Sequence, residues 1–137
     1  MRFLLLPLFF SLLVPAVSAA QTPDPLLLQS LQTWVNNGAE AGLRSLYADR
    51  PELAMEMRDS IAPVAKGLGN VLDTEVVAIQ TVSKRVVRYY VAVYYSRSPL
   101  WLRIEKYTGD RSSFFLPLRF SIDPDRILPG YITEFQL

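Results

Sequence analysis

The sequence contains neither cysteine nor histidine in its 137 residues. Without cysteine the chain forms no disulfide bond, and no lipid can be attached to an N-terminal cysteine as it is in bacterial lipoproteins. Zinc sites built from cysteine and histidine are excluded, and so are Ser-His-Asp and Cys-His nucleophile systems. The sequence therefore predicts no catalytic residue, no metal site and no cofactor.

A concentration of positive charge is also missing. The chain has 14 basic and 13 acidic residues, and because Arg2 is the one charged residue before position 21, residues 21–137 carry a net charge of about zero. Nucleic-acid-binding domains usually carry a concentrated basic patch. We therefore expect no nucleic-acid partner.

The N-terminus has the three parts of a secretory signal peptide. Arg2 supplies positive charge, residues 3–14 are mostly apolar, and small residues precede cleavage positions after Ala19 and Ala20. The apolar run is shorter than the roughly 20 residues of a membrane-spanning helix, so we expect no membrane anchor after cleavage of residues 1–20. An exported domain without disulfides is typical of the Gram-negative periplasm, where we expect this protein.

Residues 21–137 are long enough for one domain with a single hydrophobic core. The first part of this segment has helical spacing of its apolar residues. Thr22 or Asp24 could cap a helix that starts at Pro25, and Gly38 would end it.

Two more helices are predicted before the sequence changes its period. The second covers residues 39–48. The third is capped by Asp49 and has Pro51 in its first turn. Pro63 lies inside this third helix and predicts a kink or a break there, because proline lacks the backbone donor.

The second half of the chain has the two-residue period of β-strands. We predict strands at residues 74–82 and 114–122, and between them two long strands within residues 84–107 that are joined by a turn at residues 96–99. Helices followed by strands are typical of an α+β domain whose helices cover one face of an antiparallel sheet. The predicted fold is therefore two to three N-terminal helices packed on a four-stranded antiparallel sheet.

One face of the predicted sheet is almost wholly apolar. We place Tyr95 opposite Leu100, and Ile104 opposite Leu116. The inner face then consists of Val87, Tyr89, Val91, Val93, Tyr95, Leu100, Leu102, Ile104, Phe114, Leu116, Leu118 and Phe120, with Lys106 as the one charged member. A slip of one residue would bring Arg103 and Glu105 to this face, so the pattern specifies the register. The helices should cover this face.

The opposite face, which we call the outer face, combines aromatic side chains with charge. Its predicted members are Arg88, Tyr90, Ala92, Tyr94, Trp101, Arg103, Glu105, Tyr107, Phe115 and Arg119. Three interpretations are open: a solvated face held by aromatic cross-strand pairs, a dimer or partner surface, and a ligand-contacting platform. Tyrosine, tryptophan and arginine are enriched at binding hot spots. The interface candidates are Arg88, Tyr90, Tyr94, Trp101, Arg103 and Arg119.

The order of these elements, together with several local features, resembles a known superfamily. The features are glycines at residues 67 and 69, tyrosine pairs at 89–90 and 94–95, a serine-proline turn at 98–99, and an aromatic last strand that is followed by Asp123. This layout is similar to that of the nuclear transport factor two-like superfamily, one of the cystatin-like α+β rolls. The resemblance implies a curved sheet around the helices, a pocket between the two layers, and frequent dimerisation through the sheet.

Three functions remain open. The first is a non-enzymatic binding or assembly module with an unknown protein partner, or a homodimer formed through the outer face. The second is a small-molecule binder whose pocket between helices and sheet would involve Trp34, Tyr89 and Tyr95. The third is an isomerase-like enzyme, which needs carboxyl groups beside a tyrosine in an apolar pocket, and the inner face supplies none. We favour the first interpretation, in which the protein is not an enzyme.

Replacing Trp101 by glutamate tests whether the outer face is an interface. If the protein is a dimer through this face, Trp101→Glu should give a folded monomer, because a buried charge at the contact is costly. Solution mass by light scattering, with circular dichroism as the control for folding, would decide. Two monomers of equal stability would show that the face is only solvated.

Overall fold

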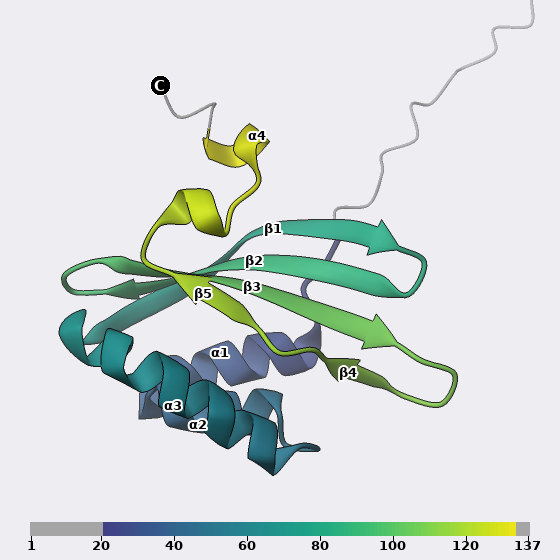
Figure 1. Ribbon diagram of the computed structural model, residues 1–137, viewed down its shortest axis with the longest axis horizontal. Helices are drawn as coiled ribbons and strands as arrows, with labels where there is room; N and C mark the ends of the chain where they lie inside the picture. The colour runs from purple at the N-terminus through teal and green to yellow at the C-terminus, as the bar shows by residue number, and fades with distance from the viewer. Residues whose placement is uncertain (1–20, 134–137) are drawn as a thin grey trace, which may run out of the picture.

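The computed structural model describes residues 21–133 of the chain. Three helices form one layer beneath an antiparallel sheet, and a short C-terminal segment lies on the opposite side of that sheet (Figure 1). The predicted α+β class, with its helices before its strands, is confirmed. The predicted signal peptide and residues 134–137 lie outside the described residues.

Helix α1 spans Pro25–Asn37 and begins and ends as its sequence predicts. The Asp24 carboxylate accepts hydrogen bonds from the amides of Leu26 (2.9 Å) and Leu27 (3.2 Å), which would otherwise lack partners. Gly38 follows with a φ of 94°, a conformation that favours glycine. Asp24 is therefore the cap, rather than Thr22.

Helices α2 (Ala39–Leu46) and α3 (Pro51–Gly67) complete the layer. The N-cap of α3 is Arg50, without a side-chain cap, so the prediction of Asp49 was wrong. Helix α3 continues through Pro63 to Gly67, so the predicted alternative of a break is wrong, and the alternative of a kink stays a prediction. Pro63 is exposed, so water can bond the carbonyl group that lacks its usual helical donor.

The sheet has five strands: β1 (Val71–Ser83), β2 (Val86–Tyr95), β3 (Pro99–Thr108), β4 (Ser113–Phe115) and β5 (Arg119–Ser121). The strand order is β1-β2-β3-β4, and β5 also pairs with β3. Two short strands therefore replace the single last strand that the sequence predicted.

The pairing of β2 with β3 differs from the prediction by two residues. Leu100 lies opposite Val93 rather than Tyr95. The connecting turn is tied to the end of α3, because the amide of Ser96 donates to the Asn70 carbonyl and that of Arg97 to the Leu68 carbonyl. Because a shift of two residues keeps every side chain on its face, the predicted faces of both strands are preserved.

The interruption between β4 and β5 reverses the predicted faces of β4. Phe115 lies opposite Lys106 and Phe120 opposite Leu102, so this segment has one residue more than the part of β3 that it faces. Phe115 is consequently in the core, 3% exposed, and its predicted place on the outer face was wrong. Phe114, predicted to face inward, is partly exposed, with the Arg50 guanidinium 4.9 Å from its ring centroid.

Tyr47 links the segment between β4 and β5 to the helix layer. Its side chain is fully buried, and its hydroxyl donates to the Leu116 carbonyl (2.9 Å) and accepts from the Leu118 amide (3.0 Å). Burial raises the pKa of Tyr47, so the hydroxyl keeps its proton in the folded protein. One side chain thus satisfies two backbone groups that the β-ladder leaves open.

The core lies between α1–α3 and the inner face of the sheet. Its sheet-derived members are Tyr89, Val91, Val93, Leu100, Leu102, Ile104, Phe115 and Leu118, with Val87, Tyr95 and Phe120 partly buried against them. Lys106, the one charged side chain predicted on this face, forms an ion pair with Asp24. The pairing removes the cost of an isolated charge at the edge of the core.

Replacing Tyr47 by phenylalanine should lower the free energy of unfolding by about 1–3 kcal/mol. The ring still fills its space, but the Leu118 amide is left buried without an acceptor. Urea denaturation measures the change, and Tyr131→Phe is the matched control because Tyr131 is 54% exposed. Equal stability of the two variants would contradict the role given to the Tyr47 hydroxyl.

Candidate functional site

The C-terminal segment covers part of the outer face. After β5 it forms the short helix η1 (Pro124–Arg126) and the one-turn helix α4 (Gly130–Thr133), on the side of the sheet opposite to α1–α3 (Figure 1). The Asp123 carboxylate caps η1 by accepting from the Asp125 amide (3.0 Å). The outer face is therefore partly covered by the C-terminal segment.

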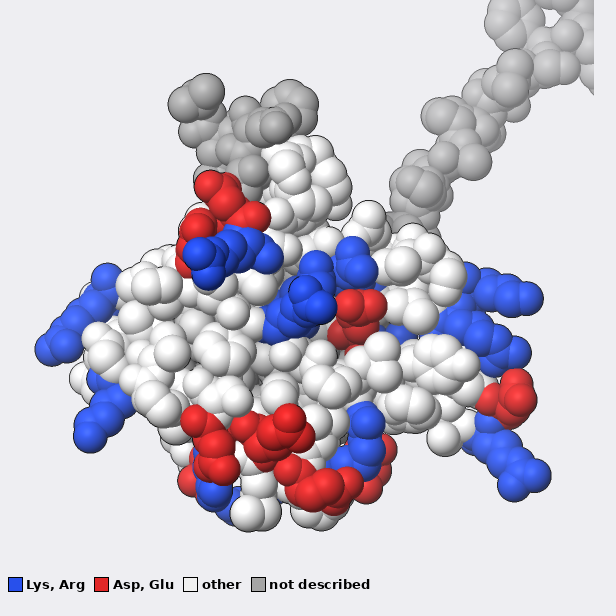
Figure 2. All heavy atoms as spheres, in the orientation of Figure 1, with Lys and Arg blue, Asp and Glu red and all other residues white. Residues whose placement is uncertain are grey.

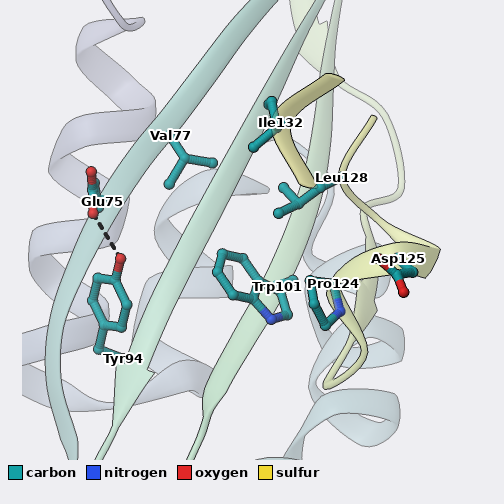
Figure 3. A pocket seen from close by; sticks show the side chains of 8 residues that line it. All are labelled: Glu75, Val77, Tyr94, Trp101, Pro124, Asp125, Leu128 and Ile132. Atoms are coloured by element: carbon teal, nitrogen blue, oxygen red, sulfur yellow. Dashed lines mark hydrogen bonds between the residues drawn. The ribbon is translucent and has the colours of Figure 1, made fainter. Parts of the chain in front are cut away.

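A cavity of about 460 Å³ lies between this segment and the outer face, and we call it the recess (Figure 3). Its lining consists of Glu75, Val77, Tyr94, Trp101, Pro124, Asp125, Leu128 and Ile132. Strands β1, β2 and β3 supply the first four of these, and the C-terminal segment supplies the others. The recess thus joins parts of the chain that are far apart in sequence.

Local features of the strands give the recess its shape. In β1, Val76 lies opposite Val91 and Ala78 opposite Tyr90, so the intervening Val77 has no partner and lines the recess.

Glu75, Ala92 and Trp101 form one row across β1, β2 and β3. The small Ala92 is fully buried between its larger neighbours, and Glu75 and Trp101 project from strands about 10 Å apart. A bulky side chain at position 92 would reduce the space between them.

The lining of the recess is acidic and aromatic. The Tyr94 hydroxyl donates to Glu75 Oε2 at 2.7 Å, as Figure 3 shows. This hydrogen bond, with a contribution from burial, raises the pKa of Tyr94, so the phenol stays neutral and holds the carboxylate in place. The eight lining residues include two carboxylates and no lysine or arginine. The recess therefore favours a positively charged group over an anion.

The other half of the outer face carries the three arginines among the predicted interface residues. Arg88 Nη2 lies 3.6 Å and Arg103 Nε 3.9 Å from Glu105 Oε1, and Arg119 lies opposite Arg103 in the pairing of β3 with β5. Tyr90, a further interface candidate, is only 2% exposed, and its hydroxyl donates to Gln80 Oε1 at 3.1 Å. Of the six candidates, Tyr94 and Trp101 line the recess.

No protein-family model, curated protein sequence or solved structure matches this chain. Function must therefore be inferred from the recess and from the distribution of charge on the outer face.

The three side chains predicted to form a pocket between helices and sheet lie in the core. The Trp34 indole Nε1 donates to the Tyr95 hydroxyl at 2.9 Å, which joins α1 to the end of β2. Burial raises the pKa of Tyr95 and also that of Tyr89. Neither the recess nor three further cavities formed by residues 21–133 include any of the three in their lining.

Two other kinds of site were sought in the part of the chain that the structure describes. Residues 21–133 contain no cluster of three or more carboxylate, histidine or cysteine side chains arranged to bind a metal ion. No helix in the same range combines the length and the apolar character that crossing a bilayer requires.

Sequence reasoning found Tyr94 and Trp101 but missed the rest of the recess. Leu128 follows the last strand and was not assigned to any surface, and the residues from Ile132 onward were expected to form a short strand or a packed end. The one available signal was the presence of apolar residues at positions 127, 128 and 132 after a polar turn, which indicates that the segment returns to the domain.

Proposed function

We propose that this protein is an exported, non-enzymatic binding module that holds its partner on the outer face of the sheet. The observation that carries this proposal is the recess. Its volume of about 460 Å³ falls within the roughly 300–1,000 Å³ of typical binding pockets, and its lining combines apolar and aromatic side chains with a few polar groups. Trp101 and Tyr94 would act as its anchors.

The proposed occupant is a lysine or arginine side chain of a partner protein. Such side chains have an apolar stem and a charged end. The stem fits against Val77 and Leu128, and the charged end can approach Glu75 and the face of the Trp101 indole, which attracts cations. No basic residue of the lining competes for these positions.

Asp24 does not have the raised pKa that an isomerase-like site needs. An isomerase site needs a carboxyl group whose pKa is raised in an apolar pocket. Burial alone would raise the pKa of Asp24, but hydrogen bonds from Lys106 and from the amides of Leu27 and Leu26 lower it overall. This carboxylate therefore stays ionised and serves as a helix cap and ion-pair partner.

The resemblance to the nuclear transport factor two-like superfamily remains part of the proposal. The order of helices and antiparallel strands supports it. The space between the two layers, where the resemblance implies a pocket, contains the packed side chains of Trp34, Tyr89 and Tyr95. The geometry therefore favours the recess over that layer as the binding site.

Homodimerisation through the outer face is a second candidate function, and the charges of that face favour it. The acidic recess occupies one half, and Arg88, Arg103 and Arg119 occupy the other. A two-fold axis through the face would place the arginines of one copy against the recess of the other. The solution mass of the protein and of Trp101→Glu tests this arrangement.

Export through the inner membrane should be visible in the mass of the purified protein. The full chain is expressed in a Gram-negative host with its own N-terminus, and the periplasmic fraction is analysed by intact-mass spectrometry. We expect a chain that starts at Ala20 or Gln21, because small residues precede both bonds. Full-length protein confined to the cytoplasmic fraction would overturn the proposed location.

Binding of a cation in the recess is tested with butylammonium, and butyrate is the control of opposite charge. In a two-dimensional NMR spectrum, the Trp101 indole signal should shift saturably with butylammonium, and the signal of the buried Trp34 should stay in place. Glu75→Gln should weaken binding about tenfold, because it removes the charge that faces the ligand.

Glu52→Gln is the matched variant on the exposed side of α3 and should bind butylammonium as the unaltered protein does. Equal shifts with butyrate, or no saturable shift of the Trp101 signal, would refute a cation site in the recess.

A further inference from the structure

The outer face carries an excess of positive charge outside the recess. Arg88, Arg103 and Arg119 have Glu105 as their one acidic neighbour on the outer face within residues 21–133, so three positive charges meet one negative charge and the net is +2. We call these three arginines the arginine cluster. In Figure 2, basic atoms lie beside a small acidic patch near the centre of the molecule.

Glu105 does not satisfy its two arginine neighbours. Its Oε1 atom lies 3.6 Å from Arg88 and 3.9 Å from Arg103, and both distances exceed that of a hydrogen bond. The Nε atoms of Arg88 and Arg103 are buried and have no acceptor among the described residues. Both side chains are less than a quarter exposed, which limits the water that can replace an acceptor. Arg88 Nη1 donates to the Tyr90 hydroxyl at 3.5 Å, and the other terminal nitrogen atoms of the two guanidinium groups have no hydrogen-bond acceptor among the described residues.

The pairing of β3 with β5 adds a second unfavourable feature. Arg103 and Arg119 lie directly opposite each other across the two strands. Like charges in such cross-strand pairs are destabilising. No ion pair within residues 21–133 neutralises Arg119. An anion between the two arginines would remove this repulsion.

We propose that the arginine cluster binds a phosphate group, either as inorganic phosphate or as part of a larger ligand. A guanidinium group donates two parallel hydrogen bonds to phosphate oxygens, and arginine is the preferred residue for this geometry. A phosphate monoester carries about −1.5 to −2 charges at pH 7, which matches the net charge of the cluster. The exposed Arg119 leaves the site open to solvent on one side.

This site does not use the recess, on which the first proposed function rests, but its arginines are the ones that the proposed homodimer would place against the recess of the other copy. The recess has acidic lining and should reject anions, whereas the arginine cluster should reject cations. The two sites share no residue, although Trp101 and Arg103 are separated by one residue on the same face of β3. A partner with both a basic and a phosphorylated group would engage both.

The test is a thermal titration of the exported protein with sodium phosphate, at constant ionic strength maintained with sodium chloride. At phosphate about tenfold above its Kd, the midpoint of unfolding should rise by about 5 °C, because phosphate binds only the folded state. Arg119→Gln should weaken binding about tenfold or more, and Arg111→Gln, on the exposed hairpin between β3 and β4, should leave it unchanged. Glycerol 3-phosphate in place of phosphate distinguishes a ligand-borne phosphate group from the free ion.

The line width of the phosphate signal in 31P NMR gives a second measurement that does not depend on unfolding. Saturable binding of either probe that Arg119→Gln weakens about tenfold or more and Glu75→Gln leaves intact supports the site. Absence of saturable binding of both probes, or equal binding by Arg119→Gln and Arg111→Gln, overturns it. Because Glu75→Gln alters only the recess, failure of one site is distinguishable from failure of the other.

Discussion

The two hydrogen bonds of the buried Tyr47 hydroxyl hold the part of the fold on which the outer surface depends. They bind the backbone at Leu116 and Leu118, where the last strand is interrupted. The extra residue in this segment turns Phe115 into the core and sets β5 against β3 so that Arg119 faces Arg103. Through these bonds, a residue at the end of α2 holds in place the segment that leads to Arg119 on the far face of the sheet.

The outer face has two halves of opposite charge. The small Ala92 lies between Glu75 and Trp101, and the C-terminal segment closes the recess above them. Beyond the buried Tyr90, which donates to Gln80, Glu105 is the one carboxylate beside Arg88 and Arg103 among the described residues, and Arg119 lies opposite Arg103. A surface with complementary halves is suited to recognise a partner by charge and to orient it, because charge pattern determines specificity more than affinity.

Much of the fold was predictable because its signals are local. The capping carboxylate of Asp24, the stop at Gly38 and the alternation along β2 and β3 each act within a few residues. The apolar face was correctly assigned along β2 and β3 even though their pairing was wrong by two residues, since such a shift preserves both faces. The error at Asp49 and the absence of a break at Pro63 concern a helix end and an exposed helix position, where water and neighbouring groups replace the missing bonds.

By itself, the sequence determined the α+β class, the inner face of the two long strands, and the absence of cysteine and histidine chemistry. Only the tertiary structure decided the face of Phe115, since the neighbouring Leu116 carbonyl is held by Tyr47, 69 residues earlier in the chain. It also decided that Leu128 and Ile132 return over Trp101 to form the recess. The physical reason is the same in both cases. These contacts join segments that are distant in the sequence, and the hydrophobic periodicity of each segment does not predict which segments come into contact.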